Sequence, residues 1–129
     1  MVMLIQSQKL YAQAIEELKD NLVSQLGDRL ETIIVYGSVA REESTEESDI
    51  DVMIISPQRK AIYDKVFDIG FQNDLKYDTL TTFILYTPDE FKRRFSCGEP
   101  LIIEVLKEGR AVYGQQQLSE YQRALQTGH

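Results

Sequence analysis

The pattern of apolar and polar positions divides the chain into helical and extended segments. Across residues 6–26, apolar side chains recur at steps of three and four, and charged side chains fall largely on the opposite face. This spacing predicts an amphipathic helix, which Gly27 is suited to end. Three short runs rich in β-branched and aromatic residues predict strands over 32–36, 49–55 and 79–86.

Helices are expected between and after these strands. Ile62, Val66 and Ile69 predict a helix over 58–75, which Gly70 weakens. Thr87, followed by proline and two acidic residues, is typical of a helix start, here of a short helix over 88–95. Further on, we expect a helical or extended segment over 101–107, a short strand or apolar plug over 111–113 and a polar helix over 117–125. Strands interleaved with helices predict one α/β domain over 1–129, with helices packed on a sheet.

Composition and charge narrow the class of protein. The 129 residues suffice for a single core, and 14 Lys and Arg against 21 Asp and Glu give a net charge of −7. Unaided binding to DNA or RNA depends on cations, so this balance argues against it, while a phosphorylated ligand held with a metal stays open. Cys97 is the single cysteine, and no apolar run reaches the length of about 20 residues that a membrane span needs. We therefore expect a cytoplasmic protein without a membrane partner.

A glycine–serine pair at the end of the first predicted strand is the first candidate for ligand binding. Gly37 lets the backbone approach a ligand, and free amides at a helix start favour an anion. The Ser38 hydroxyl adds a donor, and Arg41 is close enough in sequence to reach the same anion. A lone glycine–serine pair is a plain turn in most proteins, so it indicates a binding site only together with a second feature nearby.

Two aspartates supply that second feature. Asp49 and Asp51 are two residues apart in a predicted strand, so their side chains share one face, about 7 Å apart at the backbone. Two carboxylates converging to about 4 Å repel by about 4 kcal/mol at an effective dielectric of 20, and a divalent cation such as Mg²⁺ relieves this. The strand is otherwise apolar over 52–55, unlike a solvated surface strand. Together, the two features predict a site for a metal and a nucleoside triphosphate.

These residues resemble the signature of the minimal nucleotidyltransferase (MNT) domain of the DNA polymerase beta-like nucleotidyltransferase superfamily. The likeness rests on the motifs Gly37-Ser38-x-Ala40-Arg41 and Ser48-Asp49-Ile50-Asp51. It implies a nucleotidyltransferase fold of α/β (α+β) type, with a small mixed sheet. It also implies transfer of a nucleoside monophosphate, AMP from ATP by our expectation, to an acceptor hydroxyl with Mg²⁺ or Mn²⁺. In this interpretation the nucleotide-binding residues are Gly37, Ser38, Arg41 and Ser48, and Asp49 and Asp51 are catalytic and bind the metal.

One departure from the family leaves two interpretations open. The family carries a third carboxylate in the middle of the next strand, where the resemblance, counted back from Thr87, assigns Thr82. Threonine is a poorer Mg²⁺ ligand than a carboxylate and is no general base near neutral pH. Asp78 has the same strand parity but is four residues away, about 13 Å along an extended strand. Either Asp78 or another acid completes a catalytic site, or the chain is a weak or inactive nucleotide-binding subunit.

The same resemblance also implies a partner protein. Similar stand-alone domains are often encoded with a HEPN-domain protein and some act as its antitoxin by attaching AMP, so a HEPN partner is expected for the active form. A third hypothesis is an unrelated α/β metal-binding domain without triphosphate preference. Apolar residues near the C-terminus exceed what one small sheet needs and favour a homodimer or a partner interface: Leu101, Ile102, Ile103, Val105 and Val112.

Overall fold

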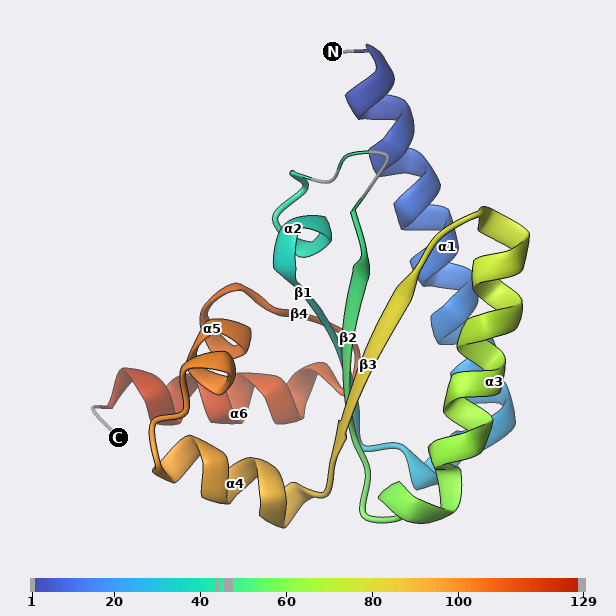
Figure 1. The fold of residues 1–129 in the computed structure, drawn as a ribbon. Coiled ribbons are helices and arrows are strands. Elements are labelled where there is room, and N and C mark those ends of the chain that lie inside the picture. The colour runs from blue at the N-terminus through green and yellow to red at the C-terminus, as the bar shows by residue number, and fades with distance from the viewer. Residues whose placement is uncertain (1, 44, 46–47, 128–129) are drawn as a thin grey trace.

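The fold is a four-stranded sheet with helices on both faces (Figure 1). The computed structural model describes residues 2–43, 45 and 48–127. The elements in chain order are α1 (Val2–Leu26), the 3₁₀ turn η1 (Gly27–Arg29), β1 (Thr32–Tyr36), α2 (Gly37–Ala40), β2 (Ile50–Ile55), α3 (Arg59–Tyr77), β3 (Thr81–Tyr86), α4 (Pro88–Ser96), α5 (Pro100–Glu108), β4 (Arg110–Tyr113) and α6 (Gln115–Gln126).

The strand order is β3-β2-β1-β4, and the sheet is mixed. β1 pairs antiparallel with β2 and with β4, while β2 and β3 run parallel because α3 crosses between them. The α/β class and the mixed sheet predicted from the sequence are confirmed. Residues 111–113 are part of a strand, and 101–107 are helical rather than extended.

The start of β3 and the end of α3 differ from the predicted boundaries. β3 begins at Thr81 rather than at residue 79, because the Asp74 carboxylate holds the turn after α3 through three hydrogen bonds. It accepts hydrogen bonds from the Thr79 hydroxyl at 2.8 Å, the Thr81 hydroxyl at 2.7 Å and the Thr81 backbone N–H at 2.9 Å. α3 ends at Tyr77 and passes through Gly70 without a break.

Each face of the sheet has its own core. α1 and α3 cover one face and α4, α5 and α6 cover the other (Figure 1). Alternate strand residues point into different cores, as Val52 and Met53 do. Ile102 and Val105 are fully buried in the second core. The second core thus takes up Ile102 and Val105, with Leu101 packed against it, while Val112 packs against the first core. The interface expected from these apolar residues stays a prediction. Among the described residues, no helix is long and apolar enough to cross a membrane.

Gly70 is where α3 approaches the sheet most closely. A Cβ atom at this position would lie 2.3 Å from Cε2 of Phe83 on β3, which is closer than real contacts allow. Glycine therefore lets the Phe83 ring pack against the helix backbone. This contact offsets the poor helix propensity that made Gly70 a predicted weak point.

We predict that Gly70→Ala destabilises the fold although alanine is the better helix former. Overpacking against Phe83 costs about 1–3 kcal/mol, and the gain in helix propensity is about 1 kcal/mol, so the net change in unfolding free energy is a loss of up to about 2 kcal/mol. Urea denaturation measures it. Gln72→Ala, at an exposed position of the same helix, is the control and should change stability little. A more stable Gly70→Ala protein would show that the Phe83 contact is not limiting.

Candidate active site

The glycine–serine pair forms the turn between β1 and the short helix α2. Gly37 has a φ of +76°, a left-handed conformation that favours glycine, and its carbonyl accepts a hydrogen bond from the Arg41 N–H at 3.2 Å. The next residue, Ser38, accepts from the Glu43 N–H at 2.9 Å through its backbone carbonyl. The chain therefore folds tightly back at the end of β1, and Ser38 lies in the first turn of α2.

Asp51 lies directly against this turn. In the sheet it pairs with Tyr36, the last residue of β1, on one side and with Thr82 of β3 on the other. A Cβ atom at Gly37 would lie 2.4 Å from Oδ2 of Asp51, so the carboxylate occupies the space that any other residue at position 37 would fill. The other oxygen, Oδ1, accepts a hydrogen bond from the Thr82 hydroxyl at 2.7 Å.

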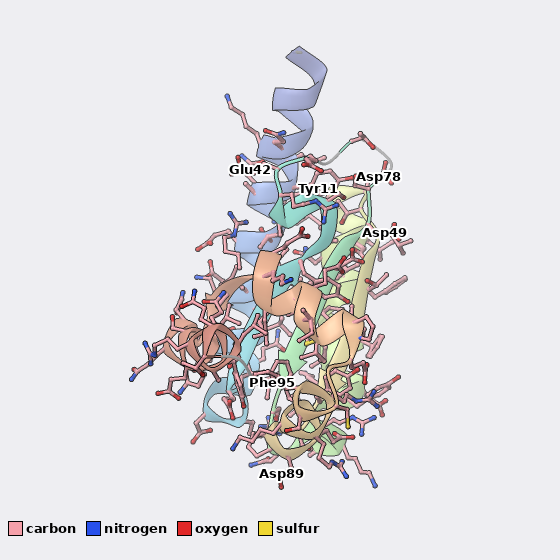
Figure 2. All side chains as sticks on the ribbon, turned by 90° about the vertical axis from the view of Figure 1, so that its left-hand side faces the viewer. Tyr11, Glu42, Asp49, Asp78, Asp89 and Phe95 are labelled. Atoms are coloured by element: carbon pink, nitrogen blue, oxygen red, sulfur yellow. The ribbon has the colours of Figure 1, made fainter. Side chains whose placement is uncertain are left out.

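Thr82 is thus the β3 side chain that reaches Asp51, in agreement with the position derived from the sequence. Asp78 lies at the C-terminal cap of α3, in a left-handed conformation with a φ of +54°. Asp78 and Asp49 are both exposed, and Figure 2 shows them at the same end of the molecule, with Glu42 and Tyr11. The geometry therefore places Asp78 near the end of the sheet that carries the site and Thr82 within it.

Asp49 precedes β2 at the end of a loop that α1 holds in place. The Tyr11 hydroxyl lies 2.8 Å from the backbone carbonyls of both Thr45 and Ser48. The Ser48 hydroxyl oxygen accepts from the Thr45 N–H at 2.8 Å, so the side chain predicted to bind nucleotide also closes this loop. Tyr11 entered the sequence prediction only as an apolar helix position. No local pattern reveals a hydroxyl that anchors a loop more than 30 residues away.

Arg41 is engaged by acidic residues. Its Nη1 atom lies 2.8 Å from Glu108 at the end of α5, and its Nε lies 3.2 Å from Glu43. The hydrogen bonds that Arg41 donates to Glu108, and then to Glu43, raise the pKa of the guanidinium above its usual value. The guanidinium carries five N–H donors, so these two contacts leave donors for a phosphate. Glu108 is a second residue that the sequence prediction did not assign to the site.

Tyr36 is buried and pairs with Asp51 across the sheet. Burial, and then the nearby Asp51 carboxylate, raise the pKa of Tyr36 to about 12. The phenol therefore stays neutral over the physiological pH range. Tyr36 adds no second negative charge beside Asp51, and it was predicted from the sequence only as a strand residue.

The residues fit a divalent cation that arrives with its nucleotide. Within the described part of the chain, no group of three or more His, Cys, Asp or Glu side chains could hold a metal alone. Mg²⁺ commonly binds through one or two carboxylates, with substrate phosphates and water completing its octahedron. Asp49 and Asp51 supply oxygen donors of that kind on neighbouring positions of one strand end. Their chemistry therefore suits Mg²⁺ or Mn²⁺ bound together with a triphosphate.

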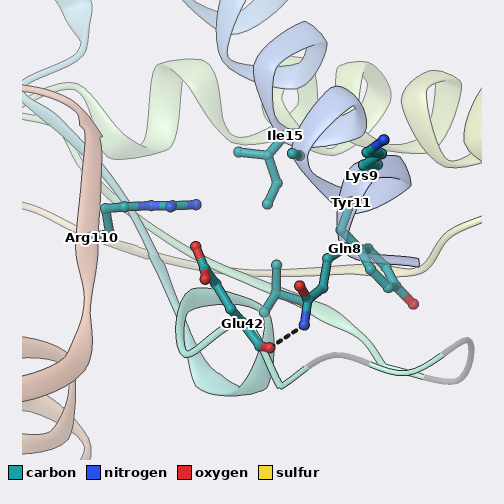
Figure 3. Close-up of a pocket in the computed structure, with 8 residues that line it drawn as sticks. Gln8, Lys9, Tyr11, Ile15, Glu42 and Arg110 are labelled. Carbon is teal, nitrogen blue, oxygen red and sulfur yellow. Dashed lines mark hydrogen bonds between the residues drawn. The ribbon is translucent and has the colours of Figure 1, made fainter. Parts of the chain in front are cut away.

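A separate cavity of about 240 Å³ lies on the α1 side of α2 (Figure 3). Arg110 and Glu42 point into it, and Gln8 donates a hydrogen bond to the Glu42 carbonyl. The other lining residues are Lys9, Tyr11, Ala12, Ile15 and Val39. The cavity contains neither aspartate of the β2 end, so we do not assign it to the metal site.

Comparison with known proteins agrees with this geometry. A family described as "Nucleotidyltransferase domain" matches residues 15–113. A Methanocaldococcus jannaschii protein named for protein adenylyltransferase activity, MJ0604, is 34% identical over 100 residues, covering 78% of this chain and 95% of that protein. A second one from the same organism, MJ0141, is 36% identical over 74 residues, covering 56% of this chain and 75% of that protein.

Two solved structures are similar in fold. One is a crystal structure described as a toxin-antitoxin with AMP-PNP, with a TM-score of 0.59 and 16% identity, covering 87% of this chain and 84% of that chain. The other is a mutant of the toxin-antitoxin MntA-HpeT, with a TM-score of 0.55 and 15% identity, covering 87% and 83%. At these identities the likeness shows a shared fold alone.

We predict that Gly37→Ala costs more stability than the same change at a glycine without neighbours. Gly98 also has a positive φ, +68°, but a Cβ there would meet nothing within 4 Å. Gly98→Ala therefore measures conformational strain alone, about 1–2 kcal/mol. Gly37→Ala should cost at least about 1 kcal/mol more, because the new methyl group displaces the Asp51 carboxylate.

Urea denaturation of both variants measures the difference. Adding Asp51→Ala to Gly37→Ala removes the clashing carboxylate and should recover most of the extra cost. Equal losses for the two glycine variants would contradict the packing of Asp51 against Gly37.

Proposed function

This chain belongs to the nucleotidyltransferase domain family, and on that premise we propose that it transfers AMP from ATP to a hydroxyl group of an acceptor protein. The observation that supports this most directly is the position of Asp51, whose carboxylate lies against the Gly37 turn at the start of β2, two residues after Asp49. This arrangement puts metal-binding oxygens next to the backbone that would hold a triphosphate. The names of the relatives from M. jannaschii support a protein as the acceptor.

Each site residue then has a defined task. Asp49 and Asp51 hold Mg²⁺ or Mn²⁺, and Ser38 with the Gly37 turn binds the phosphates. The metal, when bound, neutralises the charge that develops on the phosphoryl oxygens. Arg41 turns from Glu108 to the triphosphate, and Ser48 fixes the loop that carries Asp49. Tyr36 remains neutral and keeps water away from the buried side of Asp51.

A second candidate function is favoured by one specific contact. The Thr82 hydroxyl donates to Asp51 where the resemblance expects a third carboxylate, so this position supplies no base for the acceptor hydroxyl. With that base missing, the chain would bind nucleotide and a partner but transfer AMP slowly or not at all. Asp78, at the same end of the molecule, is the acid that would restore activity if the turn after α3 moves.

The partner we propose is a HEPN-domain protein, with this chain as its antitoxin in the cytoplasm. Support comes from the toxin-antitoxin structures that share the fold and from the family resemblance of the sequence motifs. Such a partner would supply the acceptor hydroxyl in the active form and a binding surface in the inactive form.

We predict that ATP with Mg²⁺ raises the melting temperature of the protein. A ligand that binds only the native state stabilises it by about 2.7 kcal/mol at 100 times its Kd, which is several degrees for a domain of this size. Ser38→Ala and Asp49→Ala should abolish the shift. Asp28→Ala, an exposed acid before the opposite end of β1, is the control and should keep it. If none of the four nucleoside triphosphates shifts the melting temperature with Mg²⁺ or Mn²⁺, the nucleotide-pocket proposal fails.

We predict that transfer of labelled AMP to a HEPN-domain partner is slow in the wild type and rises in Thr82→Asp. A base placed beside Asp51 can contribute up to the 10²–10⁴-fold typical of general-base catalysis. Asparagine is similar in size to aspartate but has no carboxylate that could act as a base, so Thr82→Asn should give no gain in rate. The readout is the initial rate of label incorporation.

The wild-type rate distinguishes the two candidate functions. Robust transfer that Asp78→Ala abolishes would make Asp78 a catalytic residue, and robust transfer that survives it would place the third acid elsewhere. Complete absence of transfer, with the nucleotide-induced melting shift retained, would favour the binding subunit.

A further inference from the structure

An apolar stripe runs along the outer side of α3. Six large hydrophobic side chains are exposed in the described part of the molecule, and five of them belong to α3 or to the turn that follows it. The most exposed are Leu75 at 64%, Leu80 at 60% and Phe71 at 59%. The stripe, as we define it, consists of Tyr63, Phe67, Phe71, Leu75 and Leu80. Its four helical members are four residues apart, so they form one continuous row.

The core does not use this row. α3 contacts α1 and the sheet through the residues on its other side, including the buried Ile62, Val66 and Ile69. On the outer side, Tyr63 and Phe67 stack with ring centroids 4.7 Å apart, and Phe67 meets Phe83 of β3 edge-on at 5.3 Å. The row is therefore preordered by aromatic contacts and continuous with the adjacent strand.

That strand is an open edge of the sheet. β3 is outermost in the strand order and, among the described residues, hydrogen-bonds as a strand only to β2. Its six residues, Thr81 to Tyr86, include neither proline nor a charged side chain, which are the usual means of protecting an edge from pairing. Figure 1 shows α3 and β3 together on one side of the molecule, so the stripe and the open edge form one surface.

We propose that this surface binds a second copy of the same chain, with the two α3 helices antiparallel. The four helical members of the stripe are symmetric about the level of Ile69: Phe67 and Phe71 lie two residues to either side of it, and Tyr63 and Leu75 lie six. An antiparallel pair of identical helices centred at that level brings Tyr63 against Leu75 and Phe67 against Phe71 of the second copy, while Leu80 lies beyond the helix end. Such a self-matching surface is what a two-fold interface requires.

The charges at the ends of the stripe fit the same pairing. Lys60 and Asp78 are both exposed and lie nine residues before and after Ile69, so each meets the opposite charge on the second copy. Lys76 is on the other side of the helix, where it binds Glu17 of α1 at 2.7 Å. Asp64 and Asp68 are also exposed on α3.

The full chain should therefore be a dimer in solution, and a charge within the stripe should separate it. We expect a mass of about twice 14.9 kDa by light scattering or sedimentation, across about 1–200 µM protein. Phe71→Glu and Leu75→Glu should each give the monomer mass. Leu10→Glu replaces the one exposed large hydrophobic of the described residues outside the stripe and is the matched control, which should remain dimeric. Circular dichroism checks that the variants are folded, and two variants keep the test valid if one is not.

A charge exchange tests the antiparallel register. Lys60→Glu and Asp78→Lys should each weaken the dimer about five-fold or more, and the double variant should recover most of the loss. A wild type that is monomeric up to the highest concentration overturns the proposal, as does a dimer that survives both stripe variants. If the stripe variants instead abolish binding to another protein while the wild type alone is monomeric, the surface belongs to that protein and our proposal is wrong. None of these readouts depends on nucleotide transfer, so the proposal fails separately from the proposed function.

Discussion

The contact between the Asp51 carboxylate and the Gly37 backbone is the constraint on which the rest of the candidate site depends. A side chain at position 37 would collide with Oδ2 of Asp51, and the turn needs a positive φ. Both demands are met by glycine alone. Since β1 and β2 are antiparallel, the end of one strand and the start of the other meet at this point. The Gly37 turn and the start of β2 that carries Asp51 are therefore neighbours because of the sheet register.

Without a ligand, the polar groups of the site are satisfied by one another. Thr82 donates to Asp51, Glu108 and Glu43 hold Arg41, and Tyr11 reaches the loop before Asp49. A nucleotide bound as we propose would compete with some of these contacts, which lowers its affinity by the free energy of the contacts it breaks. Under the same proposal, a divalent cation would offset the repulsion between the acidic residues of the site and an anionic ligand.

The exposed apolar surface lies apart from the core. The two faces of the sheet are covered by different helices, so the apolar residues of β1 and β2 are buried, and most of the exposed large hydrophobic side chains of the described residues lie on the outer side of α3. The turn that carries Asp78 links the apolar stripe to the end of the sheet where Asp49 lies. An interface on α3 would therefore end close to the position where the family's third carboxylate is missing.

The sequence by itself determined the local features of this protein. Periodicity located most helices and strands, because side-chain burial repeats every 3.6 or 2 residues. The motif spacing led us to expect Gly37, Asp49 and Asp51 in one site, and counting back from Thr87 assigned Thr82 to the family's third carboxylate position. The parallel register of β2 and β3 pairs this threonine with Asp51.

Contacts between distant segments were decided only by the tertiary structure. The hydroxyl of Tyr11 on the Ser48 loop and the Glu108 carboxylate on Arg41 join residues 37 and 67 positions apart, and no local pattern encodes such pairs. The apolar residues near the C-terminus favoured an interface because the sequence does not state that the sheet has two covered faces, and Ile102 and Val105 are buried in the second core. Periodicity identified Ile62, Val66 and Ile69 as one apolar face of α3, and only the tertiary structure shows that this face packs on the core while a second apolar row stays exposed.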